Sequence, residues 1–172
     1  MRVTFVRSFA PVARADARVL VLGSMPGAAS LAAGRYYAHP RNAFWPIVAP
    51  LCESAADAPY AQRLAAMQRA RIAVWDVLQS CEREGSLDGD IEAASAAAND
   101  FATLLPTLPR LRLIACNGGT AHRLFRRVAV TLPASITVPT IVLLPSTSPA
   151  HAARSLAQKR AAWTSILVPY LR

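Results

Sequence analysis

Four short apolar runs are the clearest pattern along the chain, at residues 18–22, 72–75, 111–116 and 140–144. Each run is apolar at successive positions rather than at alternate ones. This pattern is typical of strands that are buried on both faces, as in a parallel sheet covered by helices. We therefore expect these four runs to be the strands of one central sheet.

Stretches with helical character lie between the runs, and they predict helices over residues 43–52, 60–71, 91–105, 120–129 and 155–167. In the last one, Leu156, Trp163, Ile166 and Leu167 fall on one stripe, as in a helix packed on a sheet. Strands that alternate with helices predict an α/β fold, a three-layer α/β/α arrangement around a mostly parallel four-stranded sheet. No repeat or long linker divides the sequence, so we expect a single domain over residues 1–172.

Irregular segments follow three of the predicted strands, at residues 23–42, 76–90 and 145–154. The carboxyl ends of parallel strands lie at one edge of a sheet, where α/β proteins bind their ligands. We expect the three segments to meet there, together with Asn117 at the end of the third strand. They would form a single mouth.

Charge and cysteine content narrow the function classes. The net charge is +9, and eighteen of the nineteen basic residues are arginine. Such a surplus suits a phosphate backbone, although an arginine-rich and alanine-rich genome produces the same excess. Cys52, Cys81 and Cys116 are far apart and form no CxxC pair, which argues against disulfides, iron–sulfur clusters and zinc sites. We expect three buried thiols.

The apolar runs are too short for a membrane span, and the first residues lack the apolar core of a signal peptide. We therefore expect a cytoplasmic protein that binds no membrane. We also expect a monomer that holds no metal and needs no cofactor.

Common catalytic signatures are missing, including GxGxxG, GxxxxGK[ST], HExxH and GxSxG. Ser146, His151 and Asp76 could form a nucleophilic set, but their order and context match no known triad. Aromatic and neutral polar residues dominate the predicted mouth instead, which suits a planar heterocycle held by stacking and read along its edge. We expect Tyr37 in this pocket, and Phe44 and Trp45 in the core.

Three motifs carry a family resemblance. The stretch "GSMPGAASLAAGRYYAHPRNAFW" resembles the first active-site motif of the uracil-DNA glycosylase superfamily, and is closest to its hypoxanthine-DNA glycosylase and mismatch-specific branches. "LLPSTSPAH" is similar to the superfamily's loop that enters the minor groove, and "LIACNGGTAHRLF" to the strand and turn that bound the base pocket. With "WDVLQSCEREGSLDGDI" included, the resemblance runs in order over residues 18–167.

The resemblance implies a DNA repair glycosylase that hydrolyses the N-glycosidic bond of deaminated bases, hypoxanthine or uracil or both, flipped out of DNA. DNA that contains such bases would be its partner. The implied base pocket consists of Gly23, Ser24, Met25, Pro26, Gly27, Tyr37 and Asn117. The implied DNA contacts are Arg35, Arg41, Ser146, Thr147, Ser148, Pro149, His151 and Arg154.

Two departures from the family pattern affect the expected mechanism. Met25 stands where many relatives carry the Asn or Asp that positions water, and a thioether cannot orient a hydrolytic water. The hypoxanthine-DNA glycosylase branch also has a non-polar residue there, and its key side chain corresponds to Asn42. Leu144 replaces a histidine of some relatives, so backbone N–H groups, Asn117 or Ser146 would assist the departing base. Ser148 occupies the position whose side chain would enter the gap that the flipped base leaves in the duplex, the wedge position. Because serine is small, we expect it to fill this gap only weakly.

Other interpretations stay open at this stage. The same fold could be a catalytically weak or inactive module that binds nucleic acid or a damaged base, or a small-molecule hydrolase that uses Ser146. We expect His39 to brace its loop rather than to catalyse. Asp76 and Asp88 are expected to cap turns, although either could be a general base.

Overall fold

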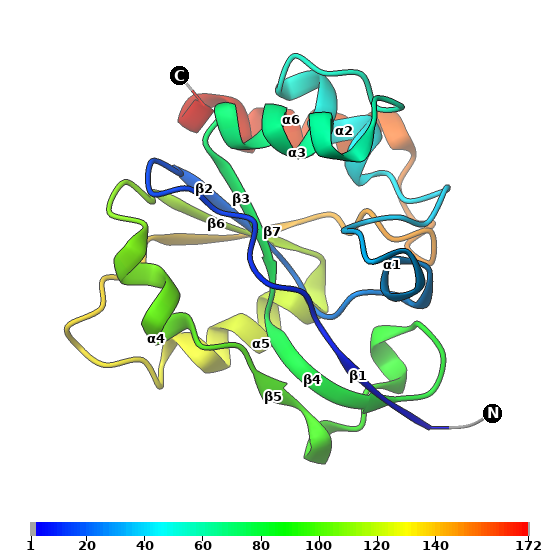
Figure 1. The fold of residues 1–172 in the computed structure, drawn as a ribbon, viewed down its shortest axis with the longest axis vertical. Helices are drawn as coiled ribbons and strands as arrows, with labels where there is room; N and C mark the ends of the chain where they lie inside the picture. Colours follow the sequence, from blue (N-terminus) through cyan, green and yellow to red (C-terminus); the bar gives the residue numbers. More distant parts are fainter. Residues whose placement is uncertain (1–2, 172) are drawn as a thin grey trace.

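A parallel four-stranded sheet forms the centre of the computed structural model, which describes residues 3–171 (Figure 1). The strand order is β3-β2-β6-β7. These strands are β2 (Val19–Gly23), β3 (Ile72–Asp76), β6 (Leu113–Asn117) and β7 (Thr140–Leu144). Each of the four predicted strands is present, and the predicted α/β fold class is confirmed.

Helices cover both faces of this sheet and make it the middle of three layers (Figure 1). One face packs against α2 (Phe44–Leu51), α3 (Tyr60–Arg69) and α6 (Leu156–Leu171). The other face packs against α4 (Phe101–Leu104) and α5 (Gly119–Ala129). Four of the five predicted helices thus occur within a few residues of their expected bounds.

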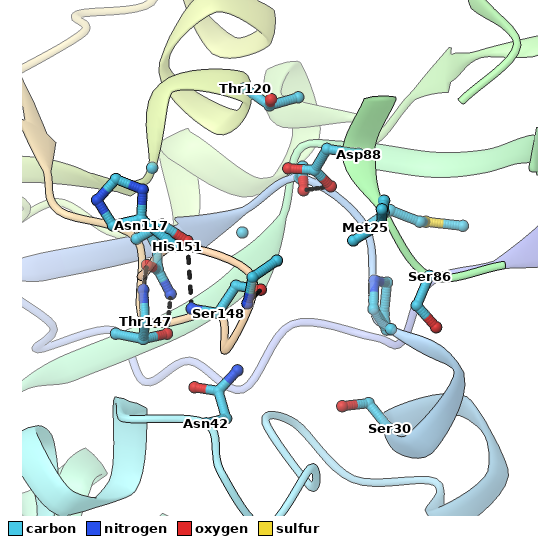
Figure 2. A pocket seen from close by; sticks show the side chains of 18 of the residues that line it. Met25, Ser30, Asn42, Ser86, Asp88, Asn117, Thr120, Thr147, Ser148 and His151 are labelled. Atoms are coloured by element: carbon cyan, nitrogen blue, oxygen red, sulfur yellow. Dashed lines mark hydrogen bonds between the residues drawn. The ribbon is translucent and has the colours of Figure 1, made fainter. Parts of the chain in front are cut away.

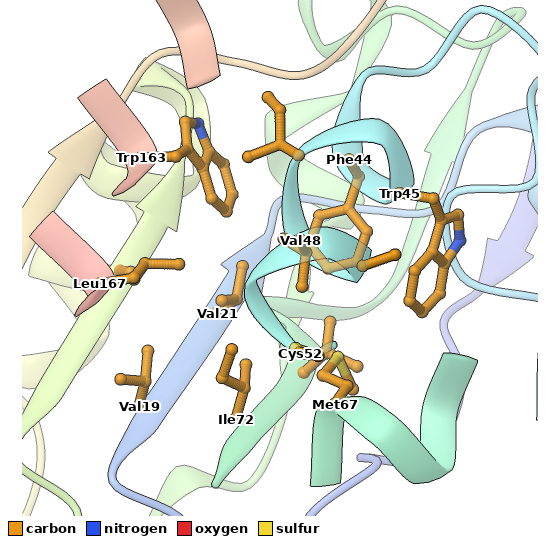
Figure 3. Close-up of a cluster of buried hydrophobic side chains, with 14 of the residues drawn as sticks. Val19, Val21, Phe44, Trp45, Val48, Cys52, Met67, Ile72, Trp163 and Leu167 are labelled. Atoms are coloured by element: carbon orange, nitrogen blue, oxygen red, sulfur yellow. The ribbon is translucent and has the colours of Figure 1, made fainter. Parts of the chain in front are cut away.

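The alternation of side chains along β2 explains why its run is continuously apolar. Val19 and Val21 face the first helical layer, whereas Leu20 and Leu22 face the second. In the first layer, shown in Figure 3, the rings of Phe44 and Trp163 meet edge to face at 6.0 Å between centroids. Both rings are fully buried, and the prediction that Phe44 belongs to the core is confirmed. Trp45, 4% exposed, is also a core residue, as predicted.

A second, antiparallel sheet was not predicted. It has the order β1-β4-β5 and consists of β1 (Thr4–Arg7), β4 (Leu78–Arg83) and β5 (Ala97–Ala98). β4 lies inside residues 76–90, so the expectation of an irregular segment there is wrong. Polar residues at exposed positions of β4, such as Gln79 and Glu82, interrupt its apolar pattern, and the buried Arg83 conceals it further.

The predicted helix over residues 91–105 is also wrong. Its alanine-rich part forms the 3-10 turn η2 (Ala93–Ser95) and the edge strand β5. The Asn99 side chain then donates to the carbonyls of Asp76 and Leu78, which fixes the chain beside β3 and β4. Helix α4 begins only where Asp100 Oδ1 accepts from the Thr103 amide, an N-cap that the helical composition upstream obscured.

Short elements complete the described chain: α1 (Ala28–Ala33), η1 (Asp88–Asp90) and η3 (Leu105–Thr107). All three cysteines are buried and free, as expected. Within residues 3–171, no helix combines the length and the hydropathy that a membrane crossing requires.

Candidate active site

A cavity of about 620 Å³ opens at the carboxyl edge of the parallel sheet (Figure 2). This volume is ordinary for a small-molecule site. Its walls come from the loop after β2, the end of β3, the segment around η1, the start of α5 and the loop after β7. The structure therefore brings together the three segments and the Asn117 strand end that were expected to form one mouth.

Most of the residues expected at this site line the cavity, and the three arginines do not. The lining includes Asn42, all seven of the expected base-pocket residues, and Ser146, Thr147, Ser148, Pro149 and His151. Further lining residues that the sequence did not single out include Ser30, Ser86, Gly118 and Arg123. Arg123 lies in α5, six residues after Asn117. The only feature of the sequence that could have indicated Arg123 was its place in the strand-turn-helix unit expected at the mouth.

The turn after β2 is held from behind by β4. The guanidinium of Arg83, 1% exposed, donates from Nη2 to the Pro26 carbonyl at 2.7 Å. Met25 packs beside Leu78 and Cys81 in a small apolar cluster of its own, although part of it reaches the cavity wall. The residue that replaces the family's water-positioning amide is thus used as packing.

Asn42 combines a structural contact with access to the cavity. Its Oδ1 accepts from the Phe44 amide at 3.0 Å, which closes an Asx turn that leads into α2. A carbonyl oxygen has a second lone pair, and the Nδ2 group has no hydrogen-bond partner in the described part of the chain. Figure 2 shows the amide directed from its loop toward the Ser148 loop. The side chain is therefore fixed in place but still able to hold a water or a ligand atom.

Tyr37 is held in a fixed orientation by stacking. Its ring lies 3.8 Å from that of Phe44, centroid to centroid, with 18° between the planes. Its backbone φ is 55°, a left-handed conformation that costs a bulky residue free energy. Burial raises the pKa of the phenol, and Asp76 raises it further. Since Tyr37 also lines the cavity, it offers a rigid aromatic surface there.

The side chain of Asn117 braces the loop after β7. Its Nδ2 donates to Thr147 Oγ1 at 2.8 Å, and its Oδ1 accepts from the Thr147 amide at 2.9 Å. The Thr147 carbonyl in turn accepts from the Ala43 amide at 3.0 Å, next to Asn42. Thr147, 1% exposed, therefore joins the third strand to the loop that carries Asn42.

Helix α6 fixes the same loop from its other side. The Trp163 indole N–H donates to the Pro145 carbonyl at 2.9 Å, and Lys159 Nζ donates to the His151 carbonyl at 2.8 Å. Lys159 is the only lysine of the chain and is almost entirely buried. Between these two anchors, Ser148 presents a small side chain to the cavity (Figure 2).

Two carboxyl groups lie in the cavity wall with different surroundings. Asp88 is exposed and accepts from Ser24 Oγ at 2.5 Å, which agrees with the expected turn-bracing role. Asp76 is 3% exposed, and its Oδ2 is buried without any hydrogen-bond partner in residues 3–171. Burial raises the pKa of Asp76 to about 7, the charge of Asp88 adds to this, and Arg83 opposes it. The expectation that Asp76 caps a turn is therefore wrong.

The predicted histidine and arginine residues of the first loop and of the loop after β7 differ in their contacts. His39 Nδ1 accepts from the Arg41 amide at 3.1 Å, so this histidine braces its loop as expected. Arg35 lies over the Tyr60 ring at 5.6 Å, while Arg41 and Arg154 are exposed. These arginines lie outside the cavity lining, so a role for them in binding DNA remains a prediction.

A serine nucleophile has no support in this geometry. Ser146 Oγ accepts from the Ser148 amide, and the described residues include no hydrogen bond that links Ser146, His151 and Asp76. Within residues 3–171, no three His, Cys, Asp or Glu side chains lie together in a way that could hold a metal ion. The cavity instead offers the aromatic surface of Tyr37, the buried carboxyl group of Asp76 and the amide of Asn42, which is held in place by its bond to Phe44.

Comparison with known proteins places this arrangement in a family. The model of the uracil DNA glycosylase superfamily matches residues 10–172. A hypoxanthine DNA glycosylase of Methanosarcina acetivorans is 37% identical over 116 residues, which cover 67% of this chain and 72% of that protein. A hypoxanthine DNA glycosylase of Methanosarcina barkeri is 35% identical over 113 residues, which cover 65% of this chain and 70% of that protein.

Comparison of folds agrees with this. A solution NMR structure from Methanosarcina acetivorans, named as a candidate uracil DNA glycosylase, superposes with a TM-score of 0.78 and 28% identity. The match covers 98% of this chain and the whole of the other. The chain therefore belongs to the uracil DNA glycosylase superfamily and is a DNA N-glycosylase.

Proposed function

We propose that this protein is a monofunctional glycosylase that removes deaminated bases, hypoxanthine or uracil, from DNA with a water oriented by Asn42. The observation that carries the proposal is the Asn42 amide, which is fixed by its bond to Phe44 and still faces the cavity with its Nδ2 unpaired. The names of the two Methanosarcina relatives favour hypoxanthine as the substrate.

The chemistry of the bond explains why an amide is enough. Breaking the N-glycosidic bond leaves positive charge on the deoxyribose and negative charge on the base, and the site accelerates the step by stabilising both. The sugar cation is already electrophilic, so the attacking water needs orientation more than a strong base. A neutral amide restricts the enzyme to bases that leave well, such as hypoxanthine and uracil.

Base flipping fits the shape of the cavity. The target base must leave the stack at a cost of a few kcal/mol, which is smallest at mismatched or deaminated positions. Phe44 covers one face of the Tyr37 ring and the ring borders the cavity, so Tyr37 can stack on the base and recover about 1–3 kcal/mol. The loop from Pro145 to His151, which supplies Ser148 to the cavity wall, would face the duplex, with Ser148 as a weak wedge.

The test is an incision assay without metal, in the presence of a chelator. Duplex and single-stranded oligonucleotides with one deoxyinosine or one deoxyuridine are incubated with the protein, and abasic sites are then cleaved with alkali. We expect strand breaks at deoxyinosine, at deoxyuridine or at both. A protein that binds these oligonucleotides and breaks none of them is a binding module, and the proposal fails.

Two substitutions separate the two roles of Asn42. Asn42→Ala removes both the turn bond to Phe44 and the water contact, whereas Asn42→Ser keeps a side-chain oxygen that can accept from the Phe44 amide but is too short to reach a substrate water. We expect both variants to lose about 100-fold in single-turnover rate, while only the alanine variant loses stability. Full activity in Asn42→Ser would exclude the amide from catalysis.

A further inference from the structure

The side chains expected to help the departing base are partly engaged in bracing the site. Negative charge that develops on the base needs hydrogen-bond donors that are already in place. Leu144 is apolar and 1% exposed, and the Asn117 amide gives one of its two N–H groups and its oxygen to Thr147. Ser146 Oγ accepts from the Ser148 amide, which fixes its position in the loop after β7. Asp76 is a further candidate donor, and its side chain has no such bracing bond in the described residues.

Asp76 lies at the end of β3, where the cavity meets the sheet. It pairs in register with Gly23, and a Cβ built on Gly23 would collide with Asp76 Oδ1. The missing side chain at residue 23 therefore makes room for the carboxyl. Asp76 lines the cavity, yet it is 3% exposed and its Oδ2 has no partner within the described residues. A buried polar atom without a protein partner needs a water, an ion or a ligand as its partner, and the place of Asp76 in the cavity wall favours the ligand.

We propose that Asp76, in its protonated form, donates a hydrogen bond to a carbonyl oxygen of the flipped base and stabilises the negative charge that forms there as the base departs. This inference rests on the proposed function for its substrate. It assigns a second catalytic residue to the cavity, at the end of β3.

The electrostatic surroundings favour the protonated form. Burial of the carboxyl and the negative charge of Asp88 raise its pKa to about 7, while Arg83 on β4 lowers it. Arg83 forms no ion pair with Asp76, and its Nη2 donates instead to the Pro26 carbonyl. The other titratable or charged groups in or beside this part of the cavity are Tyr36, Tyr37, His39, Arg123 and His151. A neutral carboxylic acid in an apolar site is a strong hydrogen-bond donor at neutral pH.

The step balances without transfer of the carboxyl proton. The bond between C1′ and the base nitrogen breaks, and its electron pair goes to the base. Charge then spreads to the carbonyl oxygen, which accepts the Asp76 hydrogen bond. Water adds to C1′ and releases its proton to solvent. In the ionised form Asp76 would repel the departing anion, so the rate is expected to fall as pH rises through the pKa of the carboxyl.

The test measures single-turnover rates on a deoxyinosine oligonucleotide between pH 5.5 and 8 for the wild type, Asp76→Ala and Asp76→Asn. The matched control is Asp57→Asn, which makes the same change at an exposed residue outside the cavity. We expect Asp76→Ala to lose about 100-fold. Asp76→Asn keeps an N–H donor that does not titrate, so its rate should stay within about tenfold of the wild type and lose the decline above pH 7.

The opposite pH dependence would overturn the inference, as would an Asp76→Ala variant with wild-type activity or an Asp76→Asn variant as slow as Asp76→Ala. A misfolded variant is recognised by its denaturation curve, and the pH profile of the wild type then decides alone. A rate that falls above pH 7 in the wild type and in Asp57→Asn supports the protonated donor.

A binding measurement separates this inference from the proposed function. Free hypoxanthine is titrated into each protein at pH 6 and pH 8 and followed by NMR. We expect the wild type to bind about tenfold more weakly at pH 8, and Asp76→Asn to bind equally at both. A protein with this behaviour that cleaves neither substrate refutes the proposed function and keeps the Asp76 donor. Binding that is absent, or independent of pH in the wild type, overturns the donor.

Discussion

Asn117 and Thr147 are joined by two hydrogen bonds: Asn117 Nδ2 donates to Thr147 Oγ1 at 2.8 Å, and the Thr147 backbone amide donates to Asn117 Oδ1 at 2.9 Å. Both residues lie where the sheet meets the cavity, and Thr147 also bonds to Ala43. The pair therefore sets the distance between the loop after β7 and the loop that carries Asn42. A residue that sequence motifs place in the base pocket has a bracing role in the structure.

Asn117→Ala is expected to lower both stability and activity. It leaves the buried Thr147 amide without its acceptor, which costs about 1–3 kcal/mol in the free energy of unfolding. Urea denaturation measures this cost, and the incision assay measures the loss of rate. Thr131→Ala is the control, because it removes only a local bond to Val128 at an exposed residue and should change stability by less than about 0.5 kcal/mol. Equal effects of the two substitutions would contradict the bracing role.

Gly23→Ala tests the close approach of two strand ends. The added methyl group meets Asp76 Oδ1, so we expect a cost of about 1–3 kcal/mol in the wild-type background. In an Asp76→Ala background most of that cost should disappear. The four unfolding free energies form a double-mutant cycle, and a coupling near zero would show that the methyl group is accommodated in some other way.

The pH dependence of stability reports the pKa of Asp76 without any substrate. The folded state binds the proton more tightly than the unfolded state, because the pKa rises from 3.8 to about 7. The stabilising contribution is therefore complete below pH 4 and is lost as pH rises toward 7 and above. Relative to Asp76→Asn, the wild type should lose about 4 kcal/mol between pH 4 and pH 8. Parallel curves for the two proteins would contradict the raised pKa.

Salt dependence of DNA binding tests the arginines next to the mouth. If Arg41 and Arg154 contact phosphates, each alanine substitution should reduce the slope of log K against log salt concentration by about 1. Arg110→Ala is the control, because this exposed arginine precedes β6, at the opposite edge of the sheet. Fluorescence anisotropy with a labelled duplex measures all three. Equal slopes in the wild type and in the Arg41 and Arg154 variants would remove both from the DNA contacts.

The parallel sheet could be predicted because its strands are buried on both faces. Continuous apolar runs such as residues 19–22 arise only where each side chain meets a covering layer. The small antiparallel sheet gives no such signal, since β4 carries the exposed polar residues Gln79 and Glu82 and the buried Arg83. Its position depends on contacts from distant residues, above all the bond from Arg83 to Pro26.

The candidate site was partly predictable for the same reason. Strand ends and loop motifs indicated which segments converge, and Asn42, Tyr37 and Ser148 do lie at one cavity. The sequence could not distinguish a side chain that faces a ligand from one that braces the loop. Asn117 and Asp76 both end strands, and only their hydrogen bonds, two for the Asn117 side chain and none for Asp76 Oδ2, separate their roles.

The two anchors that α6 supplies, Trp163 to Pro145 and Lys159 to His151, have a consequence for synthesis. The loop leaves the ribosome before the helix that fixes it. A nascent chain that ends near residue 155 would contain every residue that lines the cavity, but neither anchor. Such an intermediate should not remove bases from DNA. The growing polypeptide would therefore gain glycosylase activity only once α6 has folded onto the sheet.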